Sequence, residues 1–580
     1  MTDPESGRNS GQSTSSRHSR GRSHNSAHHR SWWERHAENS RERHILAREQ
    51  AEAQAKIFGV ARPVSLRQKM ITAAACITIV WTTWALAGQT PFTLSVSVIF
   101  SLLTFLLLFI PNGEIGNVAG IRQKVHDIVR FPPFWLGLLL LIYMVVQAQN
   151  PAVLVDLGEK SWRLHTLPDA IPWLPTGVDA PFSVGAGGMN AWRQICVFGS
   201  AWLLLCALWC GLHSRLMWEI LLCVFLANAV ILGGLGLYRI STGTTHLFDY
   251  SRLTFFSTFS YRNQGGAFFV LAISVCVALG LRYWRAAVQR GLRGGAYLLM
   301  LICGLILLGV VFATKSVASV FLGVLWLPLS LLLIIASRLL TRASFIAIGI
   351  FAALLLALAG TWWCTVDTEA FFARVDSKAK VGELPTVENT IGVELATDLD
   401  ADNPDEDYEN EPVERFSLDK GGRAELRRLS WKMFHQNRHM ETFGWGAGSY
   451  RWIAPVFQKT MPEFLKTNRR GETYLPYKTE YAHCDPLQML VEWGVVGAGI
   501  FFVGVAGFVL FAIRNFRRWR VSSVALLLGL AIFCAHSCVD FLTYNPALLL
   551  CVATVASAFH ADLRRDRPAT TTMPPEKNNG

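Results

Sequence analysis

Apolar residues fall in blocks along most of the chain, separated by shorter polar segments. Each block is close to the ~20 residues that a helix needs to cross a hydrocarbon core of about 30 Å. The blocks predict twelve membrane-spanning helices, near residues 71–88, 91–111, 131–149, 194–213, 217–237, 264–283, 295–314, 317–337, 343–364, 487–513, 521–541 and 545–561. The sequence therefore predicts an all-α polytopic membrane protein with about twelve transmembrane helices.

Basic residues collect after the second, sixth, eighth, tenth and twelfth predicted helices, on one side of the membrane. They are Arg122, Lys124, Arg130, Arg282, Arg285, Arg290, Arg293, Arg338, Arg342, Arg514, Arg517, Arg518, Arg520, Arg564, Arg565 and Arg567. Because short cytoplasmic loops carry the excess of Lys and Arg, both termini are predicted to be cytoplasmic. The loops 150–193, 238–263 and 365–486 are then predicted to lie outside.

The two ends of the chain are polar. Residues 1–70 form a basic tail whose first 30 residues show no apolar periodicity, so we expect this stretch to be disordered. From Trp32 to Phe58 the composition favours a helix, either at the anionic inner leaflet or solvated. Residues 562–580 form a second cytoplasmic tail.

The composition agrees with burial in a bilayer. Charged residues make up 17% of the chain, against about 25% in soluble domains. The net charge of +12 would raise the question of nucleic acid binding, but most of the excess lies in the clusters that set orientation. The charge therefore reports mainly on topology.

The outer loop 365–486 divides into two halves of opposite charge. Residues 365–419 hold four basic and sixteen acidic residues, a balance of −12, and we expect them to be flexible. Residues 420–485 hold twelve basic and six acidic residues, a balance of +6, and are rich in aromatic residues. A basic, aromatic surface suits an anionic or sugar-bearing ligand, so we expect the chemistry in this second half.

Three features of the second half are candidates for function. A helix is predicted from Ala424 to Phe434, with Arg423, Arg427 and Trp431 spaced along one face. The glycine-rich stretch 444–449 is either an anion-binding nest or a tight turn. His483 lies just before the next membrane helix, with Asp485 as the expected N-cap, and could take a proton from a hydroxyl.

Polar residues at the membrane edge are further candidates, because burying an ionisable group there is costly. Lys315 follows the seventh predicted helix, and His536 and Asp540 lie four residues apart on the eleventh. Lys315 and the His536–Asp540 pair could each be functional, or could be only polar residues at the membrane interface. The twelve cysteines show no metal-binding spacing, so no metal site is predicted, and a disulfide between Cys364 and Cys484 is conceivable.

Several segments resemble the O-antigen ligase and O-antigen polymerase (Wzy-type) superfamily of membrane glycosyltransferases. The likeness is carried in matched order by 252–254 with 258–268, 314–318, 427–431 with 444–449, 482–497 and 535–541. Two positions depart from the family pattern. Lys315 stands where the family has Arg, and Arg262-Asn263 stands where it has Pro-Asn.

The resemblance implies a GT-C-like fold and transfer of a glycan from undecaprenyl diphosphate to a hydroxyl of a lipid or saccharide acceptor. The reaction would take place at the periplasmic face of the bacterial inner membrane, with inversion and without a metal or other cofactor. His483 would deprotonate the acceptor, while Arg427 and Lys315 would stabilise the leaving diphosphate. The implied substrate-binding residues are Arg252, Arg262, Arg423, His536 and Asp540.

Two other classes of protein remain open from the sequence. Twelve spans would also fit a transporter of lipid-linked oligosaccharide, although the chain shows no internal repeat and its polar groups gather at one face, not at mid-membrane. A membrane scaffold whose outer loop binds glycan is the second alternative.

Overall fold

The computed structural model describes residues 64–110, 118–157, 162–181, 189–243, 256–336, 423–467 and 478–564, with short pieces at 246–247, 250–251, 471 and 473–476. The predictions for both terminal tails, the ninth span, Cys364, the acidic half of the outer loop and Arg252 lie outside the described residues.

Eleven long helices in the described residues coincide with eleven of the twelve predicted spans. They are α2 (Leu66–Trp84), α3 (Pro91–Leu106), α5 (Pro132–Gln149), α6 (Ala191–Gly211), α7 (Arg215–Thr242), α8 (Arg262–Gln289), α9 (Ala296–Ala313), α10 (Val317–Ala336), α16 (Asp485–Arg514), α17 (Val521–Ser537) and α18 (Pro546–Leu563). Nine helices in this part of the chain are long and apolar enough to cross a membrane, and α17 is a shorter apolar helix. The polytopic class is confirmed, while the count of twelve stays a prediction.

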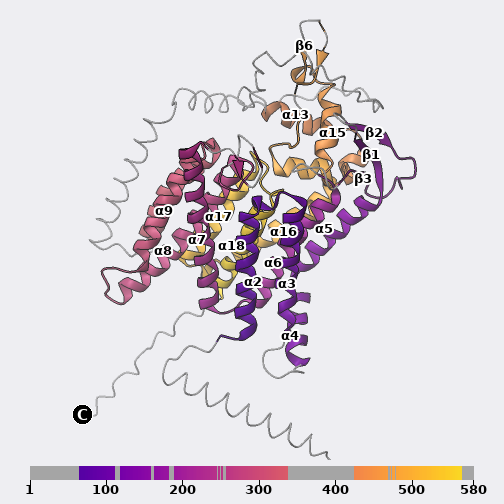
Figure 1. Ribbon diagram of the computed structural model, residues 1–580. Coiled ribbons are helices and arrows are strands. Elements are labelled where there is room, and N and C mark those ends of the chain that lie inside the picture. The colour runs from indigo at the N-terminus through magenta and orange to yellow at the C-terminus, as the bar shows by residue number, and fades with distance from the viewer. Residues whose placement is uncertain are drawn as a thin grey trace, which may run out of the picture. The chain divides into compact units, whose positions relative to one another are not determined.

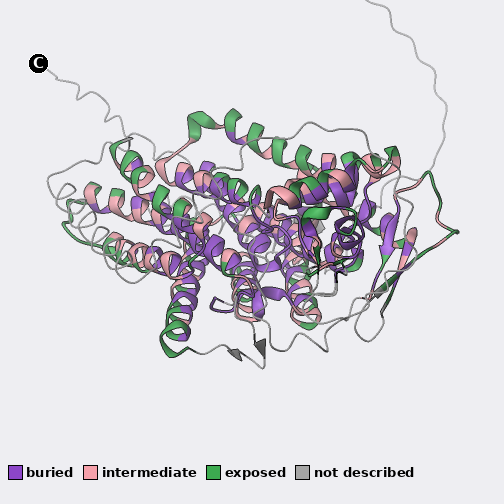
Figure 2. Cartoon of the chain, turned by 90° about the horizontal axis from the view of Figure 1, so that it is seen from above, coloured by how far each residue is buried: buried purple, intermediate pink, exposed green. Residues whose placement is uncertain are grey.

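Helix α8 packs against α7, α9, α10, α17 and α18, whereas α3, α5 and α18 pack against α6. In the most apolar stretch of α8, 89% of the residues are buried, against 17% in α16. Close approach to α8 depends on small residues: a Cβ added at Gly266 would lie 2.2 Å from Ser319 Oγ of α10, and one at Gly529 of α17 would lie 2.3 Å from Ser274 Oγ. Buried residues accordingly gather in the middle of the bundle, and exposed residues lie on the outward faces of its helices (Figure 2). This pattern fits a lipid-facing bundle.

A small extramembrane unit lies at one end of the helices (Figure 1). It combines α13 (Arg423–Phe434), α14 (Arg438–Phe443) and α15 (Tyr450–Gln458) with a sheet of β1 (Pro151–Leu157), β2 (Trp162–Thr166) and β3 (Gly177–Asp179). Strand β1 pairs antiparallel with β2 and parallel with β3. One shared core joins sheet and helices, including Val153, Leu164, Leu429 and Trp445. Two separate loops of the chain, far apart in sequence, therefore fold as one unit.

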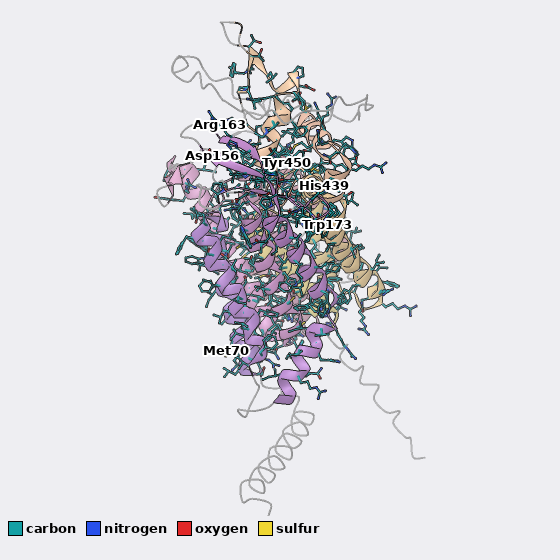
Figure 3. All side chains as sticks on the ribbon, turned by 90° about the vertical axis from the view of Figure 1, so that its right-hand side faces the viewer. Met70, Asp156, Arg163, Trp173, His439 and Tyr450 are labelled. Carbon is teal, nitrogen blue, oxygen red and sulfur yellow. The ribbon has the colours of Figure 1, made fainter. Side chains whose placement is uncertain are left out.

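The sheet itself was not foreseen. Its strands lie within the predicted outer loop 150–193, where the sequence analysis assigned no structure. Two-residue pairings also occur between β4 (His246–Leu247) and β5 (Tyr250–Ser251), and between β6 (Lys466–Thr467) and β7 (Thr473–Tyr474). Amphipathic α4 (Val118–Val129) lies at the other end of the bundle (Figure 1). Figure 3 shows the two ends in the same way, with Met70 of α2 near one end and His439 and Tyr450 near the other.

A break in α16 fastens the extramembrane unit to the bundle. Gly494 has φ +60°, so the helix is interrupted there and its carbonyl groups turn to other donors. The Val491 carbonyl accepts from the Trp445 N–H at 2.9 Å, and the Glu492 carbonyl accepts from the Gly446 N–H at 2.8 Å. On the other side, the Trp493 carbonyl accepts from the Tyr143 hydroxyl of α5 at 2.7 Å. The unit is thus tied to two membrane helices.

Candidate active site

The polar groups of the site converge on Asp540, a buried residue in the turn between α17 and α18. Its Oδ1 faces His483 Nδ1 at 3.1 Å and accepts from the Phe541 N–H at 3.0 Å. Its Oδ2 accepts from Asn263 Nδ2 at 2.5 Å and faces Arg423 Nη2 at 3.4 Å. One carboxylate therefore joins the start of α8, the start of α13, the corner before α16 and the turn after α17.

The carboxylate of Asp540 is held in its ionised form. The side chain is only 1% exposed, and burial alone would raise its pKa. The hydrogen bond and charge of His483, with the charges of Arg423 and His536, outweigh burial and hold the pKa well below its usual range. An ionised carboxylate can only accept hydrogen bonds, so His483 Nδ1 carries the hydrogen and donates it.

His483 presents its other ring nitrogen away from this pair. The residue has φ +50°, an uncommon conformation for a side chain other than glycine. Its ring meets the ring of Phe541 edge-on at 4.8 Å, and 13% of the side chain is exposed. With Nδ1 donating to Asp540, the neutral ring has its lone pair on Nε2, which is the tautomer a general base requires.

Two local predictions around His483 were wrong. Asp485 was expected to be the N-cap of its helix, but Cys484 is the N-cap and Asp485 is the first helical residue. The Asp485 carboxylate instead accepts from the N–H groups of Leu542 and Thr543, both at 2.9 Å. His536 and Asp540 were expected on one helix face, but α17 ends at Ser537 and Asp540 lies beyond it. Through these two hydrogen bonds, Asp485 connects the segment that carries His483 to the turn that carries Asp540.

The cations near this pair lie along α13. Arg423 reaches Asp540, whereas Arg427, one turn later, is exposed and donates from Nε to the Arg423 carbonyl at 3.3 Å. Burial raises the pKa of the Cys484 thiol, and the nearby charge of Arg427 opposes that rise. Arg427 therefore lies one turn beyond the residue of α13 that reaches Asp540. Trp431 continues the stripe and is 43% exposed.

The other sequence-predicted residues are less closely grouped. Lys315 sits with φ +53° between α9 and α10, is exposed and forms no ion pair with the described residues. Its turn packs against the start of α8, because Thr314 and Ser319 flank Gly266. Arg262 is exposed at the first position of α8. His536 is 1% exposed, and its Nε2 has no hydrogen-bond partner among the described groups.

The glycine-rich stretch is a turn and not a nest for a ligand. Its N–H groups are used by the protein: besides the bonds to α16, Ala447 N–H donates to Gln147 Oε1 at 3.0 Å. Gly448 N–H donates to Glu492 Oε2 at 3.1 Å. A Cβ at Gly446 would lie 2.5 Å from the Gly177 Cα, so glycine permits the close contact with β3. The predicted alternative of an anion-binding loop is therefore wrong.

Glu492 is a structural carboxylate that sequence reasoning missed. It is fully buried and accepts from Gly448 N–H at 3.1 Å, Tyr450 N–H at 3.4 Å, Gln488 Nε2 at 3.1 Å and the Tyr544 hydroxyl at 3.1 Å. These donors come from the extramembrane unit, from α16 and from the turn that holds Asp540. Asn263, the donor to Asp540, was also missed as a site residue, although it belongs to one of the segments that carry the family resemblance.

Comparison with known proteins gives one family. Residues 302–502 match the family model described as O-Antigen ligase. The match includes Lys315, Arg423, Arg427 and His483, and ends before Asp540. No curated protein matches the chain. Among the described residues, no group of three or more His, Cys, Asp or Glu side chains is placed to hold a metal ion. The match over residues 302–502 supports the O-antigen ligase/polymerase superfamily, and together with the apolar helices it supports a multi-pass inner-membrane protein with O-antigen ligase-like glycosyltransferase activity in the broad sense.

Proposed function

We propose that this protein transfers a glycan from undecaprenyl diphosphate to a hydroxyl of a lipid or saccharide acceptor, with His483 as general base. The observation that carries the proposal is the His483–Asp540 pair, in which a buried carboxylate orients an imidazole whose Nε2 is left for a ligand. An acid–base pair of this kind serves to activate a hydroxyl nucleophile.

The chemistry balances without a metal. The acceptor oxygen forms a bond to the anomeric carbon while the bond from that carbon to the diphosphate oxygen breaks. The hydroxyl proton passes to His483 Nε2, and the bonding electron pair leaves with the diphosphate. Attack from the face opposite the leaving group inverts the anomeric centre. Asp540 stabilises the imidazolium that forms, so it acts as a positioning residue.

Arg427 and Lys315 are proposed to stabilise the leaving diphosphate. Both side chains are exposed, so a phosphate can reach them. Arg427 can offer a bidentate fork, whereas Lys315 acts as a point charge. Arg423 is already turned toward Asp540 and is proposed to support the pair while it lines the same cation face. Arg252 and Arg262 are proposed as further contacts for the donor.

His536 is proposed to act through Asp540. Its ring is buried at the end of α17, just before the turn that carries Asp540. A group in that position can tune the carboxylate, whereas a substrate would have to displace protein to reach it. We infer that Asp540 also makes no contact with the substrate, because its four contacts are all with protein groups.

The proposed orientation puts the His483 end of the bundle in the periplasm and both termini in the cytoplasm. This follows from the basic clusters in the short loops. A membrane-impermeant thiol reagent checks it in spheroplasts. Cys538, which is exposed in the turn beside Asp540, should react, and the reaction should be lost in Cys538→Ser.

Reconstitution with undecaprenyl-diphosphate glycan and candidate acceptors tests the function. We expect His483→Ala and Arg427→Ala to lose transfer. Matched controls are His435→Ala, which removes an exposed histidine paired with Glu441, and Arg428→Ala, which removes the neighbouring arginine from another face of α13. Normal transfer by both site variants would overturn the assignment. Movement of lipid-linked glycan across vesicles that survives both changes, without transfer, would favour a transporter.

A further inference from the structure

Glu480, three residues before His483, carries a solvent-accessible carboxylate in the region of the proposed site. Its side chain is 31% exposed, whereas Asp540 and Asp485 are 1% exposed and Glu492 is fully buried. Asp540 and Glu492 bond protein groups through both of their oxygens, and Asp485 does so through Oδ2, while its Oδ1 is buried without a partner among the described groups. Glu480 therefore differs from them in being accessible to a ligand.

The contacts of the Glu480 carboxylate are long. The Tyr261 hydroxyl lies 3.5 Å from Oε2, and Arg451 Nη2 lies 3.6 Å from Oε1. Strong bonds between charged groups are about 2.7–2.9 Å. Each oxygen thus has room to accept a shorter bond from a ligand hydroxyl, with the tyrosine and the arginine as adjacent polar groups.

A chain of ring contacts places this group beside His483. The ring of Phe541 meets His483 at 4.8 Å, stacks on Tyr481 at 4.0 Å and meets Tyr261 at 4.9 Å. Tyr261 and His483 thus contact the same ring. Tyr261 also immediately precedes α8, whose second residue, Asn263, donates to Asp540. The Glu480 group is therefore a neighbour of the catalytic pair.

The charge of Glu480 indicates which substrate meets it. A carboxylate repels a diphosphate, so the donor's charge is better placed toward Arg423 and Arg427 on α13. A carboxylate accepts hydrogen bonds from hydroxyls, and Arg451 and Tyr261 can donate to sugar oxygens. The polar groups around His483 are thus divided into a cationic side on α13 and a side where the charges of Glu480 and Arg451 offset each other, which suits an uncharged polyol.

We propose that Glu480, Tyr261 and Arg451 form a subsite for a neutral sugar residue of the acceptor, adjacent to the hydroxyl that His483 deprotonates. The inference rests on the proposed function and deepens it, because it names the acceptor class as a sugar without phosphate at that position. A phosphate there would face the Glu480 carboxylate.

The first experiment measures transfer by Glu480→Gln as a function of acceptor and of donor concentration. The change keeps the shape but removes the charge and one acceptor atom, so we expect the acceptor KM to rise about 10- to 100-fold, with the donor KM unchanged. Tyr261→Phe should raise the acceptor KM by a smaller factor. Glu463→Gln, at an exposed carboxylate of the same unit, is the matched control and should change neither KM.

The second experiment measures binding without catalysis. Saturation-transfer NMR on the full-length protein should detect binding of a neutral oligosaccharide acceptor. The signal should be weaker with Glu480→Gln. A phosphorylated form of the same oligosaccharide should bind the wild-type protein only weakly. An unchanged acceptor KM, a raised donor KM, or equal binding by wild type and Glu480→Gln would overturn the subsite. Transfer that survives His483→Ala would instead overturn the proposed function, so the two failures are distinguishable.

Discussion

Replacing Asp540 by asparagine tests the role of the carboxylate charge while His483 itself stays in place. The side chain keeps its shape, and its one remaining oxygen, placed at the Oδ1 position, still accepts from the Phe541 N–H and faces His483. The amide NH2 then takes the Oδ2 position, where Asn263 can turn its own amide oxygen toward it. What is lost is the negative charge beside His483. Because the group is 1% exposed, water does not replace that charge. The substitution therefore tests whether the buried carboxylate stabilises the imidazolium that forms during transfer.

The distance sets the size of the effect. At the 3.1 Å between Nδ1 and Oδ1, two unit charges interact by on the order of 5 kcal/mol at an effective dielectric constant of about 20. A hydrogen bond to a charged group is worth about 1.5–3 kcal/mol net. We take about 3–4 kcal/mol as the loss in the transition state, which corresponds to a fall in kcat of roughly 10²- to 10³-fold.

The assay is steady-state transfer with saturating donor and varied acceptor. We expect kcat to fall by that factor, with the acceptor KM nearly unchanged, because the four contacts of Asp540 are all with protein groups. Asp156→Asn is the matched control, since that carboxylate is 67% exposed on β1 and its nearest ion-pair contact is 3.9 Å away. A kcat within threefold of wild type, in a variant with unchanged thermal unfolding, would refute the reasoning.

Three further predictions concern stability. Gly446→Ala should destabilise the protein by about 3 kcal/mol or more, because φ is +108° and the new Cβ would meet the Gly177 Cα. Thermal unfolding in detergent measures this loss. Gly507→Ala is the control and should not show it, because nothing lies within 4 Å of the Cβ added there. Lys315→Gly should stabilise the fold by up to about 1 kcal/mol by relieving the left-handed backbone, while transfer falls; equal stability of Lys315→Gly and Lys315→Ala would contradict the strain argument. Since the folded pKa of Asp540 lies below its unfolded value of 3.8, its contribution to stability is fully present above pH 5 or so and falls as the pH drops toward the folded pKa; unfolding midpoints of Asp540→Asn should therefore lack part of the acid loss seen in wild type.

The helices were predictable because a bilayer imposes both length and composition on each span. The expected 317–337 and the observed α10, Val317–Ala336, differ by one residue. The amphipathic helix with Arg423, Arg427 and Trp431 was likewise predictable, since its spacing is a local property. Local patterns therefore gave the elements that carry the cations and the corner that carries His483.

Patterns could not give the partners that come from distant parts of the chain. The eleventh span was expected to continue to residue 541, but α17 ends at Ser537. The Asp485 carboxylate takes the N–H groups of Leu542 and Thr543 from the segment that follows. The turn 444–449 likewise resembles a ligand-binding loop by its glycines alone. The structural role of this turn became evident only from α16, whose free carbonyl groups at the helix break accept hydrogen bonds from the N–H groups of the turn.

Backbone strain links the two sides of the proposed site. Five residues other than glycine have positive φ in the described part of the chain, and His483 and Lys315 are two of them. Such a conformation costs on the order of 1–3 kcal/mol and persists only where the surroundings impose it. At His483 the surroundings are visible, because the hydrogen bonds of Asp485 and Asp540 hold the corner from both sides. The strain is therefore consistent with a site that fixes its base before substrate arrives, which lowers the cost of orientation during transfer.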